Sequence, residues 1–160
     1  MPGRINHFPR FAGKCMLALF ARDISIPNGA CGYIMSLSHR ILLLCAALAL
    51  LLATMLGAYG AHGLQGSLSA NAWSAYQTAV QYQFLHALGL IATVLIARAY
   101  PASKPIAASS WLLLVGIVLF CGSIYATSFG APASFGALAP YGGTAFMLGW
   151  LALAIGVARA

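Results

Sequence analysis

Four long apolar segments that contain almost no charge constrain the fold of this chain. They span about 41–61, 73–97, 110–128 and 141–157. Each has roughly the twenty residues that a helix needs to cross a hydrocarbon core about 30 Å thick. Hydrophobic residues make up 62% of the chain and charged residues 6%, whereas soluble domains carry about 25% charged residues. Because the loops between the segments are short, the sequence predicts an all-α, multi-pass integral membrane four-helix bundle.

Glycine and proline residues separate these segments. Gly60 and Gly63 follow the first segment, and Ser69 can cap the second. Pro101 should end the second segment, because proline cannot continue the helical hydrogen-bond ladder. Pro140 stands where a first-turn proline suits the start of the fourth helix.

The positions of the basic residues predict the orientation of the bundle. Arg98 and Lys104 lie between the second and third segments, Arg40 precedes the first and Arg159 follows the last. The other two connections carry no charge. Because cytoplasmic loops of membrane proteins are enriched in Lys and Arg, we expect both termini in the cytoplasm.

Acidic residues are almost absent, since Asp23 is the only one in the chain. Paired carboxylates, carboxylate metal clusters and a Ser-His-Asp triad are therefore excluded, and we expect no enzymatic activity. The net charge of +7 does not indicate nucleic-acid binding, because half of the Lys and Arg precede residue 35 and the others flank the apolar segments. The four cysteines form no Cys-x-x-Cys motif, and we expect neither a metal nor a cofactor.

Residues 1–34 differ from the rest of the chain, with dispersed charge, three prolines and no convincing span. Met35 begins a plausible N-terminus just ahead of the first segment. We therefore expect 1–34 to be a non-native or disordered extension, and 35–160 to be a single four-helix transmembrane domain.

The second segment carries polar side chains where they are costly. At 100° per residue, Tyr82, Gln83 and His86 share the face that should point into the bundle. His86 lies 12 residues before Arg98, about 18 Å along the helix and hence near the bilayer centre. Since intramembrane polar residues mark a pathway or a helix contact, these three are a candidate intramembrane polar cluster.

Three further polar residues lie elsewhere. His62 and Gln77 should both be near the outer boundary, as a candidate outer-surface site. Gln81 lies deeper on the lipid-facing side and needs a partner, so it is a candidate for self-association. His62 and His86 differ too much in depth to form a two-histidine metal site.

Small residues predict where the helices pack, because they let lipid-embedded backbones approach closely. In the first segment they recur every fourth residue, and in the fourth segment they form a second stripe. The expected contacts are Ala49, Ala53, Gly57, Ala61 and Gly149.

Several motifs resemble those of the domain of unknown function 423 family. They are Gly57-Ala-Tyr-Gly-Ala-His-Gly, the run from Thr78 to Gly89, Phe120-Cys-Gly-Ser-Ile-Tyr-Ala, and the run from Ala139 to Trp150. The resemblance covers about 38–159. It implies a small multi-pass protein of the bacterial inner (plasma) membrane, similar to the transmembrane protein 256 group, with no established activity.

Three functional hypotheses follow. In the first, the chain is a non-enzymatic membrane protein that assembles with itself or with a membrane protein partner, surrounded by lipid, and its polar groups hold helices together. In the second, it is a small transporter or channel component, in which His86 relays protons or binds a solute with Gln83 and Tyr82. The third is an enzyme acting on a quinone or lipid at His62. The role of His86 separates the first two.

Overall fold

The computed structural model describes residues 35–160, and these residues contain helices and no strands. Four helical stretches are each long and apolar enough to cross a membrane, so the predicted all-α four-helix membrane architecture is confirmed. The expectations for 1–34, including a start at Met35, concern residues outside the described range. The helices are α2 (Leu37–Tyr59), η1 (Gly60–Leu64), α3 (Ala70–Ala99), α4 (Lys104–Gly116), η2 (Ile117–Cys121), α5 (Gly122–Ser128), η3 (Ala133–Leu138) and α6 (Ala139–Ala158).

The helices begin where the local sequence favours it. The hydroxyl of Ser36 accepts from the backbone N–H of His39, and that of Ser69 from the N–H of Ala72, each at 3.3 Å, which satisfies donors left free at a helix start. Pro105 and Pro140 stand in the first turns of α4 and α6. The spans begin three to eight residues before the predicted ranges and end at most three residues after them.

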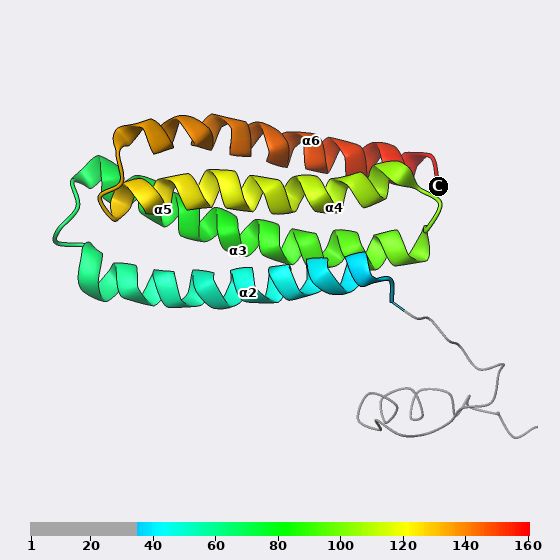
Figure 1. The fold of residues 1–160 in the computed structure, drawn as a ribbon, viewed down its shortest axis with the longest axis horizontal. Helices are drawn as coiled ribbons and strands as arrows, with labels where there is room; N and C mark the ends of the chain where they lie inside the picture. The colour runs from blue at the N-terminus through cyan, green and yellow to red at the C-terminus, as the bar shows by residue number, and fades with distance from the viewer. Residues whose placement is uncertain (1–34) are drawn as a thin grey trace, which may run out of the picture. The chain divides into compact units, whose positions relative to one another are not determined.

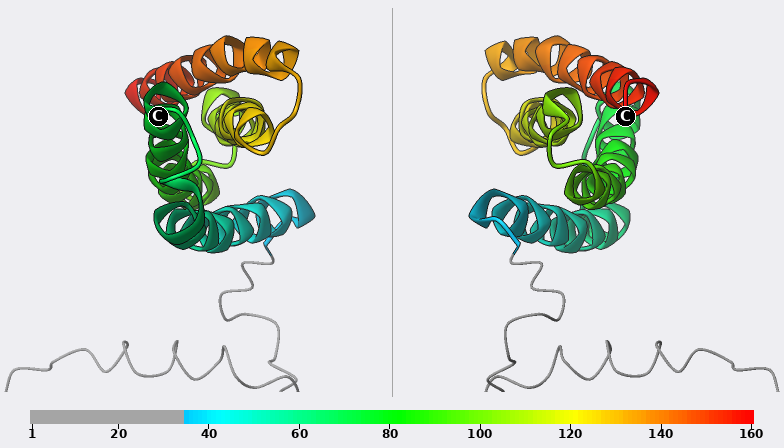
Figure 2. Two further views of the ribbon diagram at one scale, coloured as in Figure 1. Left: turned by 90° about the vertical axis from the view of Figure 1, so that its left-hand side faces the viewer. Right: turned by 90° about the vertical axis from the view of Figure 1, so that its right-hand side faces the viewer.

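The four spans run up and down, with α4 at the centre of the packing (Figures 1 and 2). α4 packs against α3 and α6, while α2 packs mainly against α3. The start of α2, the α3–α4 connection and the C-terminus lie at one end of the bundle (Figure 1). This end carries Arg40, Arg98, Lys104 and Arg159, and we call it the basic end. The opposite end is the uncharged end.

Glycines spaced seven residues apart let α6 approach its neighbours. Gly142, Gly149 and Gly156 are all buried. A Cβ atom at 142 would lie 2.7 Å from the Cα atom of Phe120, and one at 149 would lie 3.0 Å from a methyl carbon of Leu113. The predicted packing role of Gly149 therefore agrees with its position, and the whole stripe serves the contact with α4 and η2.

The packing role predicted for Ala61 is wrong. Ala49 and Ala53 are buried and Gly57 is partly buried, but Ala61 is exposed. Residues four apart rotate by about 40° per step around a helix of 3.6 residues per turn, so a stripe with that spacing drifts off the buried face. The buried line passes instead to Gly60 and Leu64.

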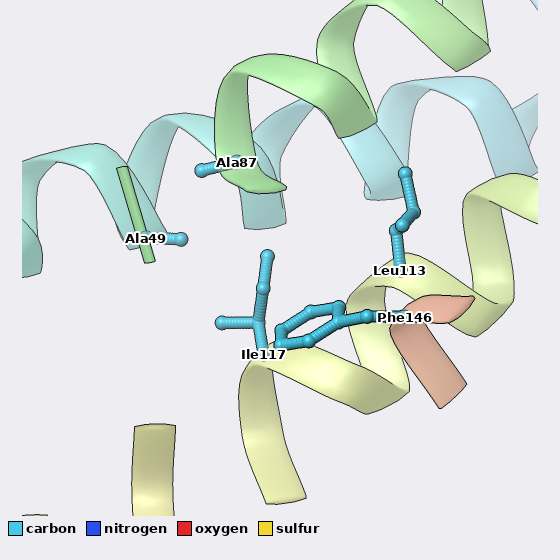
Figure 3. Close-up of a cluster of buried hydrophobic side chains, with 5 residues drawn as sticks. All are labelled: Ala49, Ala87, Leu113, Ile117 and Phe146. Carbon is cyan, nitrogen blue, oxygen red and sulfur yellow. The ribbon is translucent and has the colours of Figure 1, made fainter. Parts of the chain in front are cut away.

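A compact apolar cluster ties the helices together at mid-bundle. Ala49 of α2, Ala87 of α3, Leu113 of α4, Ile117 of η2 and Phe146 of α6 pack on one another (Figure 3). Ile117 points towards the two alanines, which leave room for it (Figure 3). The polar residues of α3 are arranged around this cluster.

Candidate intramembrane polar site

Gln83 joins α3 to α2 inside the bundle. Its side chain is buried, and its Nε2 donates to the backbone carbonyl of Ala49 at 2.8 Å. The small Ala49 lets the amide reach that carbonyl, which already accepts within α2. The Oε1 atom of Gln83 is buried and has no hydrogen-bond partner within residues 35–160.

His86 faces a different neighbour. Its Nδ1 lies 2.8 Å from the carbonyl of Tyr82, and because a carbonyl only accepts, Nδ1 carries the proton. The ring stacks on Phe146 of α6, with centroids 3.5 Å apart and planes at 18°, and Trp150 lies 6.1 Å away. His86 is therefore held by its own helix and by aromatic packing against α6.

Tyr82 stands at the edge of this aromatic group. Its ring stacks on Phe120 with centroids 5.1 Å apart and lies 5.4 Å from His86, yet the side chain is 41% exposed. Tyr82 thus faces the bundle only in part. The three residues of the predicted cluster are not joined by side-chain hydrogen bonds: Gln83 points to α2, while His86 and Tyr82 lie towards α6 and η2.

Further side chains connect α3 to its neighbours. The Tyr76 hydroxyl donates to the carbonyl of Leu56 at 2.7 Å, the thiol of Cys121 to the carbonyl of Ala79 at 3.4 Å, and the Ser110 hydroxyl to Thr93 at 3.0 Å. These three bonds and the Gln83 bond are the side-chain hydrogen bonds between spans in the described part of the chain, and each of them involves α3. Sequence reasoning missed Tyr76, although it stands seven residues before Gln83 and so shares its face.

The predicted outer residues lie on the surface near the uncharged end. His62 is exposed in η1, and Gln77 and Gln81 are exposed on α3. No hydrogen bond links His62 to Gln77. The two glutamines instead border a recess of about 190 Å³ between α2 and α3, which we call the glutamine recess; its other lining residues are Gly57, Ala61, Trp73, Tyr76 and Val80.

A larger groove, of about 360 Å³, opens between α2 and the stretch from α4 to α5. We call it the lateral groove. Gln83 and Tyr125 line it, and the Tyr125 hydroxyl is also buried without a partner among residues 35–160. The remaining lining residues are Cys45, Leu48, Ala49, Leu52, Leu56, Leu114, Ile117, Val118, Cys121 and Gly122.

The basic end holds a recess of about 610 Å³ between the α3–α4 connection and the C-terminus. Lys104 and Arg159 both line it. No group of three or more His, Cys, Asp or Glu side chains able to hold a metal occurs within residues 35–160.

Comparison with known proteins places this bundle in a family. The family model described as "Protein of unknown function (DUF423)" matches residues 56–143. The UPF0382 membrane protein YwdK of Bacillus subtilis is 35% identical over 120 residues, which are 75% of this chain and 98% of that protein. A UPF0382 membrane protein of Staphylococcus saprophyticus is 39% identical over 73% of this chain and 96% of its own length.

A third relative, a UPF0382 membrane protein of Haemophilus influenzae, is 42% identical over 63% of this chain and 80% of its own length. No solved structure matches the chain. The aligned region of the first two relatives covers nearly their whole length, and their printed description as membrane proteins agrees with the four spans. The chain is therefore a multi-pass membrane protein that belongs to the family described as protein of unknown function (DUF423).

Proposed function

We propose that this chain is a non-enzymatic protein of the bacterial inner (plasma) membrane that assembles with a second copy of itself through the face of α3 bearing Gln81. Both termini lie in the cytoplasm in this arrangement. The orientation rests on the four cations grouped at the basic end, as the excess of Lys and Arg in cytoplasmic loops requires. There Lys104 and Arg159 can contact anionic lipid headgroups.

The interior polar groups support assembly over transport. Gln83 and Tyr76 donate to carbonyls of α2, and His86 is stacked on Phe146. These contacts fix how the spans pack, which is the usual work of polar side chains between membrane helices. They form no hydrogen-bonded chain from one end of the bundle to the other.

Gln81 is the observation that carries the proposal. It is exposed, and it lies eight residues after Trp73, which stands near the start of α3, so it is about 12 Å further along the helix. Its amide makes no hydrogen bond within residues 35–160. An unpaired amide in hydrocarbon is costly, because lipid offers it no partner. An amide carries both donors and acceptors, so two Gln81 side chains related by a two-fold axis can satisfy one another.

The glutamine recess beside Gln81 supports assembly through the same face of α3. It is bordered by Gly57 and Ala61 of the α2–η1 stretch, whose small side chains allow a neighbouring helix to come close. Gln77 lies one turn nearer the uncharged end, where its amide reaches the interface and water.

The test compares Gln81→Leu with Gln77→Leu in lipid vesicles, with dimerisation measured by single-molecule photobleaching over a range of protein-to-lipid ratios. Interhelical hydrogen bonds in membranes contribute about 0.6–2 kcal/mol each. Loss of a reciprocal pair should therefore raise the dimer dissociation constant about tenfold or more. Gln77→Leu should change it little.

A monomeric wild-type protein at all ratios, or a dissociation constant that Gln81→Leu leaves unchanged, contradicts the proposal. The orientation is tested separately with the single variants Ser36→Cys and Ser134→Cys, labelled from outside intact cells in a chain whose native cysteines are replaced. Only the cysteine at 134 should react with an impermeant reagent.

A further inference from the structure

We infer that the recess at the basic end binds the phosphate of an anionic glycerophospholipid, and that it prefers phosphatidylglycerol to phosphatidylethanolamine. We call it the basic recess; it lies between the α3–α4 connection and the C-terminus, and Lys104 and Arg159 line it. The inference deepens the contact with anionic lipid that the proposed function includes. It depends on neither self-association nor the orientation of the chain.

The first argument is that both cations are accessible and have no acidic partner. The side chains of Lys104 and Arg159 are exposed, so a ligand can reach them. No Asp or Glu occurs within residues 35–160. Ala160 also lines the recess, but its α-carboxylate forms no ion pair with either cation in this part of the chain. A ligand that carries its own negative charge is therefore favoured at this position.

The second argument is that the packing of α4 on α6 brings the two cations to one recess. A Cβ atom at Gly156 would lie 3.0 Å from the backbone nitrogen of Ile106 and 3.3 Å from the Oγ of Ser103, so the start of α4 closely contacts the end of α6. Lys104 follows Ser103 directly. Arg159 stands three residues after Gly156, about 4.5 Å further along and on the same face. The two cations therefore flank a single helix contact.

The wall that the α3–α4 connection contributes is held in place by its own backbone. The N–H of Ser103 donates to the carbonyl of Tyr100 at 3.0 Å, which closes a four-residue turn with Pro101 at its second position. Pro105 follows in the first turn of α4. Because proline fixes φ at both positions, this wall loses little conformational entropy when a ligand binds.

The polar groups of the recess match a phosphate that carries a glycerol group. An arginine guanidinium can bind two phosphate oxygens at once, and a lysine ammonium adds a point charge. Tyr100 and Ser103 also line the recess, and neither hydroxyl makes a hydrogen bond within residues 35–160. Each hydroxyl can donate to a phosphate oxygen or accept from an alcohol.

The charge of the recess selects among phospholipid headgroups. Phosphatidylethanolamine carries an ammonium beside its phosphate. In the basic recess that ammonium would lie close to two cations, and the described residues offer it no acidic side chain. Phosphatidylglycerol has an uncharged glycerol in the same place and keeps its net negative charge. We therefore expect it to bind more tightly.

The depth of the recess favours a lipid phosphate over a soluble one. Lys104 begins α4 and Arg159 directly follows α6, so both stand where the spans leave the hydrocarbon. The ring of Tyr100 is 46% exposed beside them, and tyrosine is enriched at this level of a membrane. Basic pockets between membrane helices are known to bind anionic headgroups. The volume of about 610 Å³ falls in the range of small-molecule sites, roughly 300–1,000 Å³.

The experiment measures lipid binding to the full chain in nonionic detergent micelles, where orientation has no influence. Native mass spectrometry counts bound lipid during titration with dioleoyl phosphatidylglycerol or with dioleoyl phosphatidylethanolamine. We expect one tight phosphatidylglycerol per protomer, in monomers as well as in dimers. Because a cation near a membrane surface contributes about 1 kcal/mol, the dissociation constant for phosphatidylethanolamine should be about fivefold higher or more.

Three single variants locate the site. Lys104→Gln and Arg159→Gln each remove one cation and should raise the dissociation constant for phosphatidylglycerol about fivefold. Lys104→Arg keeps the charge and should bind as wild type. Arg40→Gln is the matched control, because Arg40 is an exposed cation at the same end but outside the recess; it should change the constant less than twofold. All four substitutions are at exposed positions, and far-UV circular dichroism checks that the helices are retained.

Three outcomes overturn the inference. One is equal affinity for the two lipids, which would mean that the headgroup is not recognised. Another is a loss in Arg40→Gln as large as that in Lys104→Gln, which would mean that only the total charge of this end attracts lipid. The third is displacement of phosphatidylglycerol by micromolar sn-glycerol 3-phosphate, which would make a soluble phosphate compound the ligand.

Discussion

Adding one methyl group at Gly142 is the sharpest test of how α6 packs on the neighbouring span. A Cβ atom there would lie 2.7 Å from the Cα atom of Phe120, whereas ordinary contacts begin near 3.4 Å. The obstacle is backbone, which cannot rotate away. α6 must therefore move by about 0.7 Å or more, and the shift loosens the α6 contacts on both sides of Gly142.

Gly143 provides the matched control. A Cβ at this neighbouring position meets nothing within 4 Å. Both substitutions gain the same helix propensity, up to about 1 kcal/mol, so the difference between the two variants isolates the steric cost. Overpacking in a closely packed core costs about 1–3 kcal/mol, and a clash with backbone falls at the upper end.

We expect Gly142→Ala to lower the free energy of unfolding by about 2–3 kcal/mol relative to Gly143→Ala. The measurement is reversible unfolding in mixed micelles of increasing SDS content, followed by far-UV circular dichroism. If Gly142→Ala is as stable as Gly143→Ala, the close approach of α6 to η2 is not a feature of the folded protein, and the packing argument fails.

Other predictions concern α3. Gln83→Leu should lower the free energy of unfolding in the same micelles by about 0.6–1.7 kcal/mol, because it removes the bond to Ala49; an unchanged value would mean that this bond contributes nothing. His86→Phe should preserve stability because the stack on Phe146 is retained, while His86→Ala leaves a cavity and should cost about 2 kcal/mol or more; similar losses in both would contradict a packing role. Gly89→Ala should displace the half-exposed Trp150 ring, seen as a shift in tryptophan emission with only a small loss of stability; an unchanged spectrum would refute that contact.

The sequence was sufficient to predict the four spans and several of their boundaries, because hydropathy and capping are local properties. Ser69 does cap α3, and Pro140 does stand in the first turn of α6. The burial of Gln83 and His86 followed from helical periodicity. Periodicity identifies a face of a helix but not the neighbour beyond it, so it could not separate Gln83, directed at α2, from His86, stacked on α6.

The features that the sequence did not predict correctly were missed for similar physical reasons. Ala61 was misplaced because a four-residue spacing does not follow the helical repeat over several turns. The lateral groove could not be foreseen, because it depends on how α2 is placed beside the α4–α5 stretch, and short loops do not encode that arrangement. Tyr125 lies far from Gln83 in the sequence and lines the same groove only because of this arrangement.

The acceptors of the interhelical bonds have an evolutionary consequence. Tyr76, Gln83 and Cys121 all donate to main-chain carbonyls, at Leu56, Ala49 and Ala79. The main-chain carbonyl is present whichever residue occupies the acceptor position. Selection on these bonds therefore acts on the donor side chain alone, and the acceptor position is constrained only by the size of its side chain. Across related chains, a retained glutamine at 83 should therefore have no covarying partner at 49, and coevolution methods would overlook this contact between α2 and α3.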